Sequence, residues 1–116
     1  MEPINLAEKL GQFSEHWSPK IVADYNGNDV MVVKVLGEFN WHCHPDTDDF
    51  FLVLDGEIDI EMRDRTVTLM AGEMFVVPKG VEHRPVAQKE AHLMVIEPCG
   101  TPNTGDAATA VTKDRI

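Results

Sequence analysis

Apolar residues recur along most of the chain in short runs that turn-forming residues separate. Val30–Leu36 and Phe50–Leu54 are rich in β-branched or aromatic residues, and apolar and acidic residues alternate between Ile58 and Met62. Such runs, bounded by Gly, Pro, Asn and Asp, predict β-strands. Further strands are expected at Lys20–Tyr25, Thr66–Met70, Met74–Val77, Val81–Val86 and Ala91–Glu97. The pattern predicts an all-β fold, an antiparallel sandwich or small barrel.

A single helical pattern precedes these strands, between Ile4 and Trp17. Asn5 can cap the helix, with Glu8 three residues later as its capping-box partner. One apolar stripe is formed by Leu6, Leu10 and Phe13. Gly11 weakens the helix, so a short helix is expected. His16 follows it and is expected at the surface or the helix end.

Length and charge narrow the class of protein. The 116 residues suit one domain, which we divide into an N-terminal helix (1–18), a β-barrel (20–98) and an extended tail (99–116). A net charge of −10 disfavours nucleic acid and anionic membranes as partners. Cys43 and Cys99 form no metal or redox motif, and no leader peptide or membrane-spanning run stands out. We therefore expect a cytoplasmic protein with reduced thiols.

The run Phe50–Leu54 is apolar at every position. A strand with two apolar faces is covered on both sides. One face would point into the barrel, and the other would be covered by the helix, a second sheet or a partner subunit. This run and the neighbouring strands lead us to expect a homodimer.

Candidate chemistry lies just before that run. His42 and His44 are two residues apart, so in a strand their side chains share one face, while Trp41 faces the other. The turn residues that follow would bring Asp49 back beside them. Two imidazoles and a carboxylate are the donors that a divalent transition metal prefers.

Two motifs in the chain resemble those of the cupin superfamily. Gly37, His42, His44, Asp49 and Gly56 are similar to its first motif. Its second motif is matched by Gly72, Pro78, Gly80 and His83. The resemblance covers residues 30–98 and is closest to a small single-domain cupin of the cupin 2 type. It implies an antiparallel jelly-roll barrel holding a divalent metal (Fe, Mn, Ni, Cu or Zn) through His42, His44, Asp49 and His83.

The match to the family pattern is incomplete at two positions. The family's usual acid is Glu, and Asp49 is one methylene shorter. Ala87 stands where the second motif usually has Asn. A register slip of one residue would also put Asp48 in place of Asp49.

Strand alternation predicts an apolar pocket beside this site. If Asp49 points inward, Phe51 and Val53 do too. Whether Lys34 faces the pocket depends on the register. His92 is a weak candidate for a catalytic base, with a surface position favoured. Arg63 and Arg65 are expected in a solvated turn, so no cation stands ready for a phosphate or carboxylate substrate.

Two functions are consistent with these residues. One is a metalloenzyme that acts on a small organic molecule, by dioxygenase-like or isomerase/lyase chemistry. The alternative is a non-catalytic cupin that binds or senses a small ligand, with a structural metal. A barrel with vestigial histidines is disfavoured by the intact set of four residues. The fold alone does not distinguish the metalloenzyme from the non-catalytic protein, because one fold can support many functions.

Overall fold

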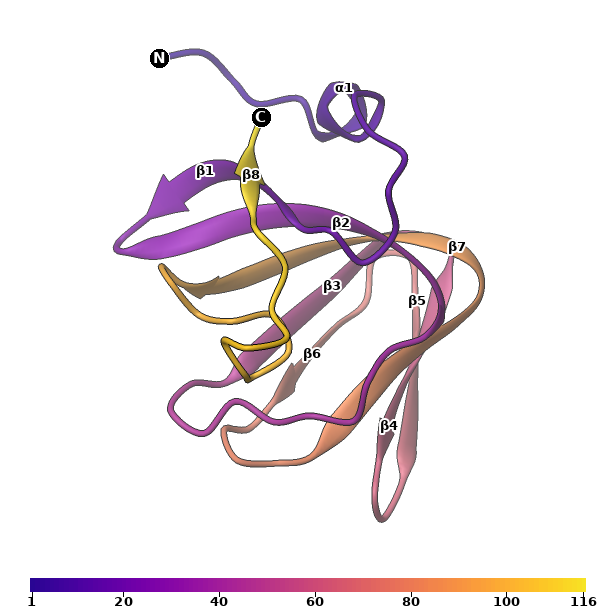
Figure 1. Cartoon of the computed structure of the whole chain (residues 1–116). Coiled ribbons are helices and arrows are strands. Elements are labelled where there is room, and N and C mark those ends of the chain that lie inside the picture. Colours follow the sequence, from indigo (N-terminus) through magenta and orange to yellow (C-terminus); the bar gives the residue numbers. More distant parts are fainter.

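The computed structural model describes all 116 residues and has eight strands and one short helix (Figure 1). In chain order the elements are α1 (Leu6–Leu10), β1 (Lys20–Tyr25), β2 (Asn28–Glu38), β3 (Asp49–Asp55), β4 (Glu57–Met62), β5 (Thr66–Met70), β6 (Met74–Val77), β7 (His83–Pro98) and β8 (Asp114–Arg115). The predicted all-β jelly-roll with one N-terminal helix is confirmed. No helix is long and apolar enough to cross a membrane.

Strand β7 is the centre of the sheet. It pairs with β2 along most of its length, with β4 through His83–Val86, and with β3 through residues from His92 to Ile96. The prediction of two separate strands, Val81–Val86 and Ala91–Glu97, is wrong because this one strand has 16 residues. The polar residues between them, Gln88–Glu90, are exposed but stay within the strand as a bulge, because the register with β2 shifts between Val35 and Gly37.

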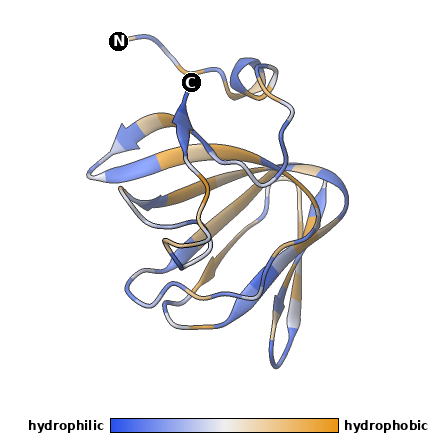
Figure 2. Ribbon diagram, viewed as in Figure 1, coloured by the Kyte–Doolittle hydropathy of each residue, from blue (hydrophilic) through white to orange (hydrophobic).

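The sheet curves around a single core without closing into a continuous barrel. Its hydrogen-bonded order is β5-β4-β7-β2-β1-β8, and β6 joins through β3, which pairs with β7. Buried side chains from β2, β3, β4, β5, β6 and β7 form one cluster, and the hydrophobic colouring follows these strands (Figure 2). The largest fully buried apolar residues are Met31, Ile58, Ile60 and Leu93.

Helix α1 begins as predicted but ends early. The side chain of Asn5 accepts a hydrogen bond from the Glu8 N–H at 3.0 Å, and the helix stops after Leu10, before Gly11. The chain then runs along the outside of β2, where Lys34 Nζ donates to the carbonyl of Phe13 at 2.6 Å. Lys34 therefore lies beneath the N-terminal segment and does not line the pocket described below.

Residues 99–116 fold back over the end of the sheet (Figure 1). Gly105 packs against the Cys43 carbonyl so closely that there is no room for a Cβ. The segment ends in β8, which pairs in parallel with Lys20 and Ile21 of β1. Through Asn103, this segment forms part of the wall of the cavity beside the candidate site.

Candidate metal centre

Backbone pairing joins the two sequence motifs. His42 lies in the connection between β2 and β3, and His83 is the first residue of β7. The His42 N–H donates to the His83 carbonyl at 3.0 Å, and the His83 N–H donates to the His42 carbonyl at 2.9 Å. Of the two histidines in the first motif, only His42 forms a strand-like bridge. His44 lies in the loop that follows. The Gly80 N–H anchors that loop by donating to the His44 carbonyl at 2.9 Å.

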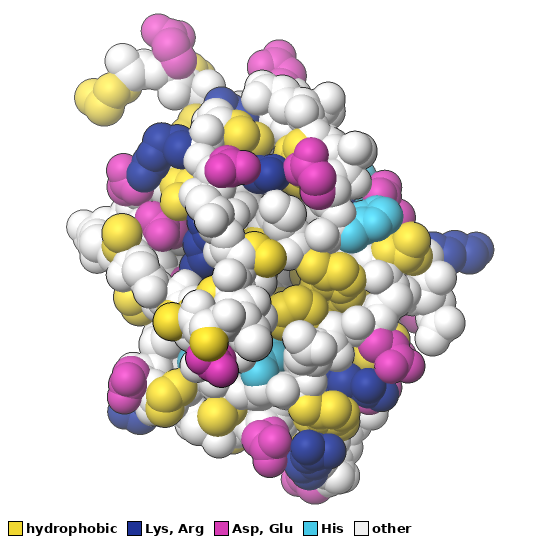
Figure 3. Space-filling model, in the orientation of Figure 1, with side chains coloured by type: hydrophobic (Ala, Val, Ile, Leu, Met, Phe, Trp, Pro, Cys, Tyr) yellow, Lys and Arg dark blue, Asp and Glu magenta, His cyan; other side chains and the backbone are white.

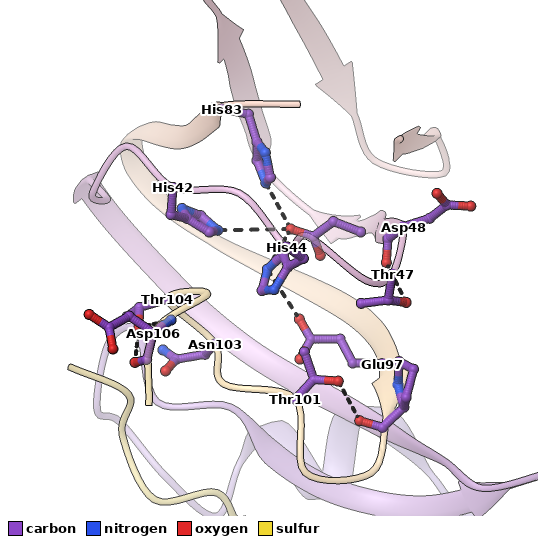
Figure 4. A network of polar contacts seen from close by, with 12 residues as sticks. His42, His44, Thr47, Asp48, His83, Glu97, Thr101, Asn103, Thr104 and Asp106 are labelled. Carbon is purple, nitrogen blue, oxygen red and sulfur yellow. Dashed lines mark hydrogen bonds and ion pairs between the residues drawn. The ribbon is translucent and has the colours of Figure 1, made fainter. Parts of the chain in front are cut away.

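Figure 4 shows His42, His44 and His83 directed toward one another. The point where they converge is occupied by Asp49, the first residue of β3. Its Oδ2 is 2.8 Å from His83 Nε2, 3.3 Å from His44 Nε2 and 3.9 Å from His42 Nε2. Asp49 is 4% exposed. Burial alone would raise the pKa of Asp49, but His44 and His83 outweigh it and lower this pKa to about 2. The site therefore contains a buried, ionised carboxylate.

The orientation of two imidazoles is set by backbone carbonyls. His42 Nδ1 donates to the Asn40 carbonyl at 2.8 Å, and His83 Nδ1 donates to the Val81 carbonyl at 2.9 Å. Both rings therefore direct Nε2 toward Asp49. Burial lowers the pKa of His42, which keeps Nε2 of the neutral ring unprotonated. A carbonyl bound to the second nitrogen is the usual support of a metal-ligating histidine.

His44 has a polar atom with no partner. Its side chain is 3% exposed, and its Nε2 is a buried side-chain atom without a hydrogen bond. The 3.3 Å approach to Asp49 lacks the alignment of a hydrogen bond. Burial opposes protonation, but Asp49 outweighs it and raises the pKa of His44. Because buried polar atoms are rarely left unpaired, this nitrogen fits a metal ligand well.

Asp48 does not compete with Asp49 for the inward position. Its Oδ1 accepts a hydrogen bond from the Lys79 N–H at 2.9 Å, and the residue is exposed. In the register between β3 and β6, Asp49 lies opposite Val77. The slipped register is therefore not adopted.

Glu97, near the end of β7, is a second buried acid that the sequence interpretation missed. It is 5% exposed, with Oε1 4.0 Å from His44 Nε2 and Oε2 2.9 Å from Lys113 Nζ. Burial, reinforced by Asp49, raises the pKa of Glu97. One signal could have found it: Glu97 has the same parity as Leu93 and Val95, so it is a charged residue on an otherwise apolar strand face.

A small, mostly apolar cavity adjoins the cluster, with a volume of about 50 Å³. That is room for about four water molecules. Its wall is made of Trp17, Pro19, Val33, Val35, Phe39, His42, Asp49, Phe51, Pro85, Leu93, Val95, Glu97 and Asn103. In Figure 3 apolar side chains gather at the centre of one face with histidine close by. Phe51 lines this cavity, whereas Val53 is fully buried in the core and does not reach it.

The remaining candidates lie outside the cavity. His92 is on the outer face, with Nε2 3.2 Å from Glu90 Oε2, so its position does not suit a base in the pocket. His16 contacts the other oxygen of Glu90 at 2.7 Å. The guanidinium of Arg63 lies 3.9 Å from the ring centroid of Trp41, so Arg63 also points away from the cavity.

Comparison with known proteins agrees with this architecture. Residues 29–97 match the family model of the cupin domain, and the chain belongs to the cupin family. A Bacillus subtilis protein of uncharacterised function, YdbB, is 32% identical to this chain, in an alignment that covers 82% of this chain and 96% of the relative. A cupin-2 domain protein of Shewanella frigidimarina is 50% identical, with a TM-score of 0.81, covering 82% of this chain and 93% of that one.

A more distant structure is similar in fold alone. Hydroquinone 1,2-dioxygenase of Sphingomonas, solved in complex with 4-nitrophenol, is 22% identical with a TM-score of 0.73. The match covers 84% of this chain and 32% of the dioxygenase chain. The cupin fold thus occurs in an enzyme whose structure holds a small aromatic molecule, and this chain presents His, Asp and Glu groups arranged so that they could hold a metal ion.

Proposed function

We propose that this cupin binds one divalent transition metal through His42, His44, Asp49 and His83 and acts with it on a small organic molecule. The observation that carries the proposal is the convergence of three imidazole Nε2 atoms on one buried carboxylate oxygen, at 2.8 to 3.9 Å. Nitrogen and carboxylate donors in this number suit iron, manganese, nickel, copper or zinc.

The cavity wall supports a small and largely uncharged substrate. It contains no Lys or Arg, so a phosphate or carboxylate group would find no cation there. Phe51 and Leu93 provide apolar contact and exclude water, while His42 and Asp49 border the same space. A bound metal would supply activation of dioxygen or polarisation of a carbonyl group. Dioxygenase-like or isomerase/lyase chemistry is therefore our proposal.

A second candidate is a non-catalytic binding or sensor protein. The observation that favours it is the lack of a separate acid or base in the cavity. Its titratable wall residues, His42, Asp49 and Glu97, all belong to the buried cluster. His92, the spare histidine, lies on the outer face. In that case the metal would fix the cavity and would not turn over a substrate.

Two measurements test this proposal. Metal analysis of protein purified after supplementation should find about one divalent ion per chain, and finding none would overturn the site assignment. Turnover on a panel of catechols, diketones and sugars, under air and anaerobically, separates the two candidates. Product formed only under air supports a dioxygenase, and product formed in both supports isomerase or lyase chemistry. Binding without product supports the sensor.

A homodimer is also part of the proposal, and the outer face of β3 supports it. Phe50 and Leu52 on this face lie opposite Val76 and Met74 of β6. Val76 and Met74 are 40% and 53% exposed, so the apolar face extends to the surface. Burying it against a second copy would remove this apolar area from water. Light scattering at micromolar concentration should give a dimer mass, and a monomer mass would contradict the proposal.

A further inference from the structure

We propose that Glu97 is a fifth metal donor, so that the centre consists of three imidazoles and two carboxylates. This inference rests on the proposed function and extends it to a residue outside both sequence motifs. It also assigns a role to the C-terminal segment, because Lys113 of that segment holds the Glu97 carboxylate in place.

The distances place Glu97 in a set of donors that shares Asp49 with the motif histidines. One donor atom each from His44, Asp49 and Glu97 lies within 4.8 Å of the others, and all three residues are buried. The donor atoms of His42, Asp49 and His83 form a second such set, so the two sets meet at Asp49. Glu97 Oε1 is 4.0 Å from His44 Nε2. Two donors on opposite sides of one ion lie about 4 Å apart, given metal–ligand bonds of about 2.1 Å. The spacing is therefore that of two ligands sharing an ion.

A second observation is the unpartnered nitrogen of His44. Its Nε2 has no hydrogen bond and lies 3.3 Å from a carboxylate oxygen of Asp49. On its other side it faces Glu97 at 4.0 Å (Figure 4). An ion at this position would take the lone pair of His44 together with an oxygen of each acid. All three groups would then be satisfied at once.

Lys113 leaves one oxygen of Glu97 available. Its Nζ binds Oε2 at 2.9 Å and also donates to the Thr101 carbonyl, so the lysine is held by the same segment. Oε1 is thereby directed toward His44. In charge terms, the two carboxylates would neutralise a divalent ion. Lys113, 10% exposed, offsets part of their charge when no ion is bound.

Five protein donors restrict what the centre can bind. On an ion with six positions, five donors leave one, so a ligand would attach through a single atom. Two carboxylates also favour a metal that accepts oxygen donors and high coordination, such as manganese or iron, over tetrahedral zinc. The inferred ligand class is therefore a small molecule with one donor atom, and chelating catechols are disfavoured.

The experiment compares Glu97→Gln with Glu90→Gln, a matched change on the exposed side of the same strand. Calorimetric titration with Mn²⁺ should show at least about a tenfold loss of affinity for Glu97→Gln and no change for Glu90→Gln. The visible spectrum of bound Co²⁺ should also intensify in Glu97→Gln, because the coordination number falls. The double variant Glu97→Gln/Lys113→Met should behave like Glu97→Gln, which separates loss of the donor from exposure of an unpaired lysine.

Two results would overturn the inference. One is an unchanged affinity and Co²⁺ spectrum in Glu97→Gln while His83→Ala loses the metal, which would leave the proposed four-residue site intact. The other is a loss in Lys113→Met as large as that in Glu97→Gln, because Glu97 would then act by holding the C-terminal segment. Failure of wild type to bind any metal would instead refute the proposed function itself.

Discussion

Two clusters of histidine around a carboxylate occupy opposite sides of the sheet. In the buried one, His83 and His44 approach Asp49, and the closest contact is 2.8 Å. In the outer one, His16 and His92 approach Glu90 at 2.7 and 3.2 Å. The distances are alike, but the Asp49 side chain is 5% exposed and the Glu90 side chain is 45% exposed.

This difference in exposure decides what each cluster can do. Water can solvate the outer residues, so their ion pairs contribute little to stability. Their polar atoms also need no further partner, because water can provide one. The buried residues have no such alternative, and one nitrogen of His44 has no hydrogen-bond partner at all. Similar residues at similar spacing thus make an ordinary surface ion pair in one place and a candidate metal site in the other.

The largest effect is expected on metal affinity, which should depend on the buried cluster and not on the outer one. His83→Ala removes a nitrogen donor, so metal affinity should fall by more than about 100-fold, because loss of a supporting residue alone costs up to that much. His92→Ala should leave the affinity unchanged. Equilibrium dialysis followed by metal analysis measures both. Equal losses in the two variants would show that the buried cluster is not the metal site.

A smaller effect concerns the metal-free protein in acid. The pKa of Asp49 is about 2 in the folded chain and near 3.8 when unperturbed. A lowered folded pKa stabilises the fold above the unfolded value, and this contribution is lost as the pH falls from about 4 to 2. It amounts to about 2 kcal/mol.

Urea unfolding with a chelator present should therefore show wild type more stable than Asp49→Asn at pH 6. The gap should close toward pH 2. A gap that does not depend on pH would mean that the Asp49 charge contributes nothing to stability.

The smallest effect is expected at the surface. His16→Ala should change the free energy of unfolding by less than about 1 kcal/mol, because exposed ion pairs contribute little. Salt should reduce even this difference, since exposed charges are screened. Thermal or urea unfolding at low and high ionic strength would measure it. A change of several kcal/mol would mean that the outer cluster anchors the N-terminal segment to β7.

Local patterns were enough to predict much of the fold and of the candidate site. Apolar runs located most of the strands, and the spacing of His42, His44 and His83 selected the residues that the structure brings together. Alternation from Asp49 predicts that Phe51 points inward, and in the structure Phe51 lines the cavity. These features can be predicted from alternation within one strand or from the two family motifs.

What the sequence did not reveal depends on contacts between distant residues. β7 is continuous because β2 pairs with it on both sides of the exposed polar residues, at Ala87 and at Ala91, so that Lys89 between them stays within the strand. Glu97 looked like the end of a strand, because its partner Lys113 lies 16 residues further on, in a segment with no periodic pattern. The inward parity of Glu97 could be predicted from the strand, but its pairing with Lys113 has no local signature.

The paired backbone hydrogen bonds between His42 and His83 have a consequence for metal exchange. They hold two of the imidazoles together through the main chain, independently of any ion. Unlike a small zinc domain that folds only around its metal, a chain that binds a metal as proposed would exchange it while folded. The supply of free ions in the cell and their relative affinities would then decide which metal is bound.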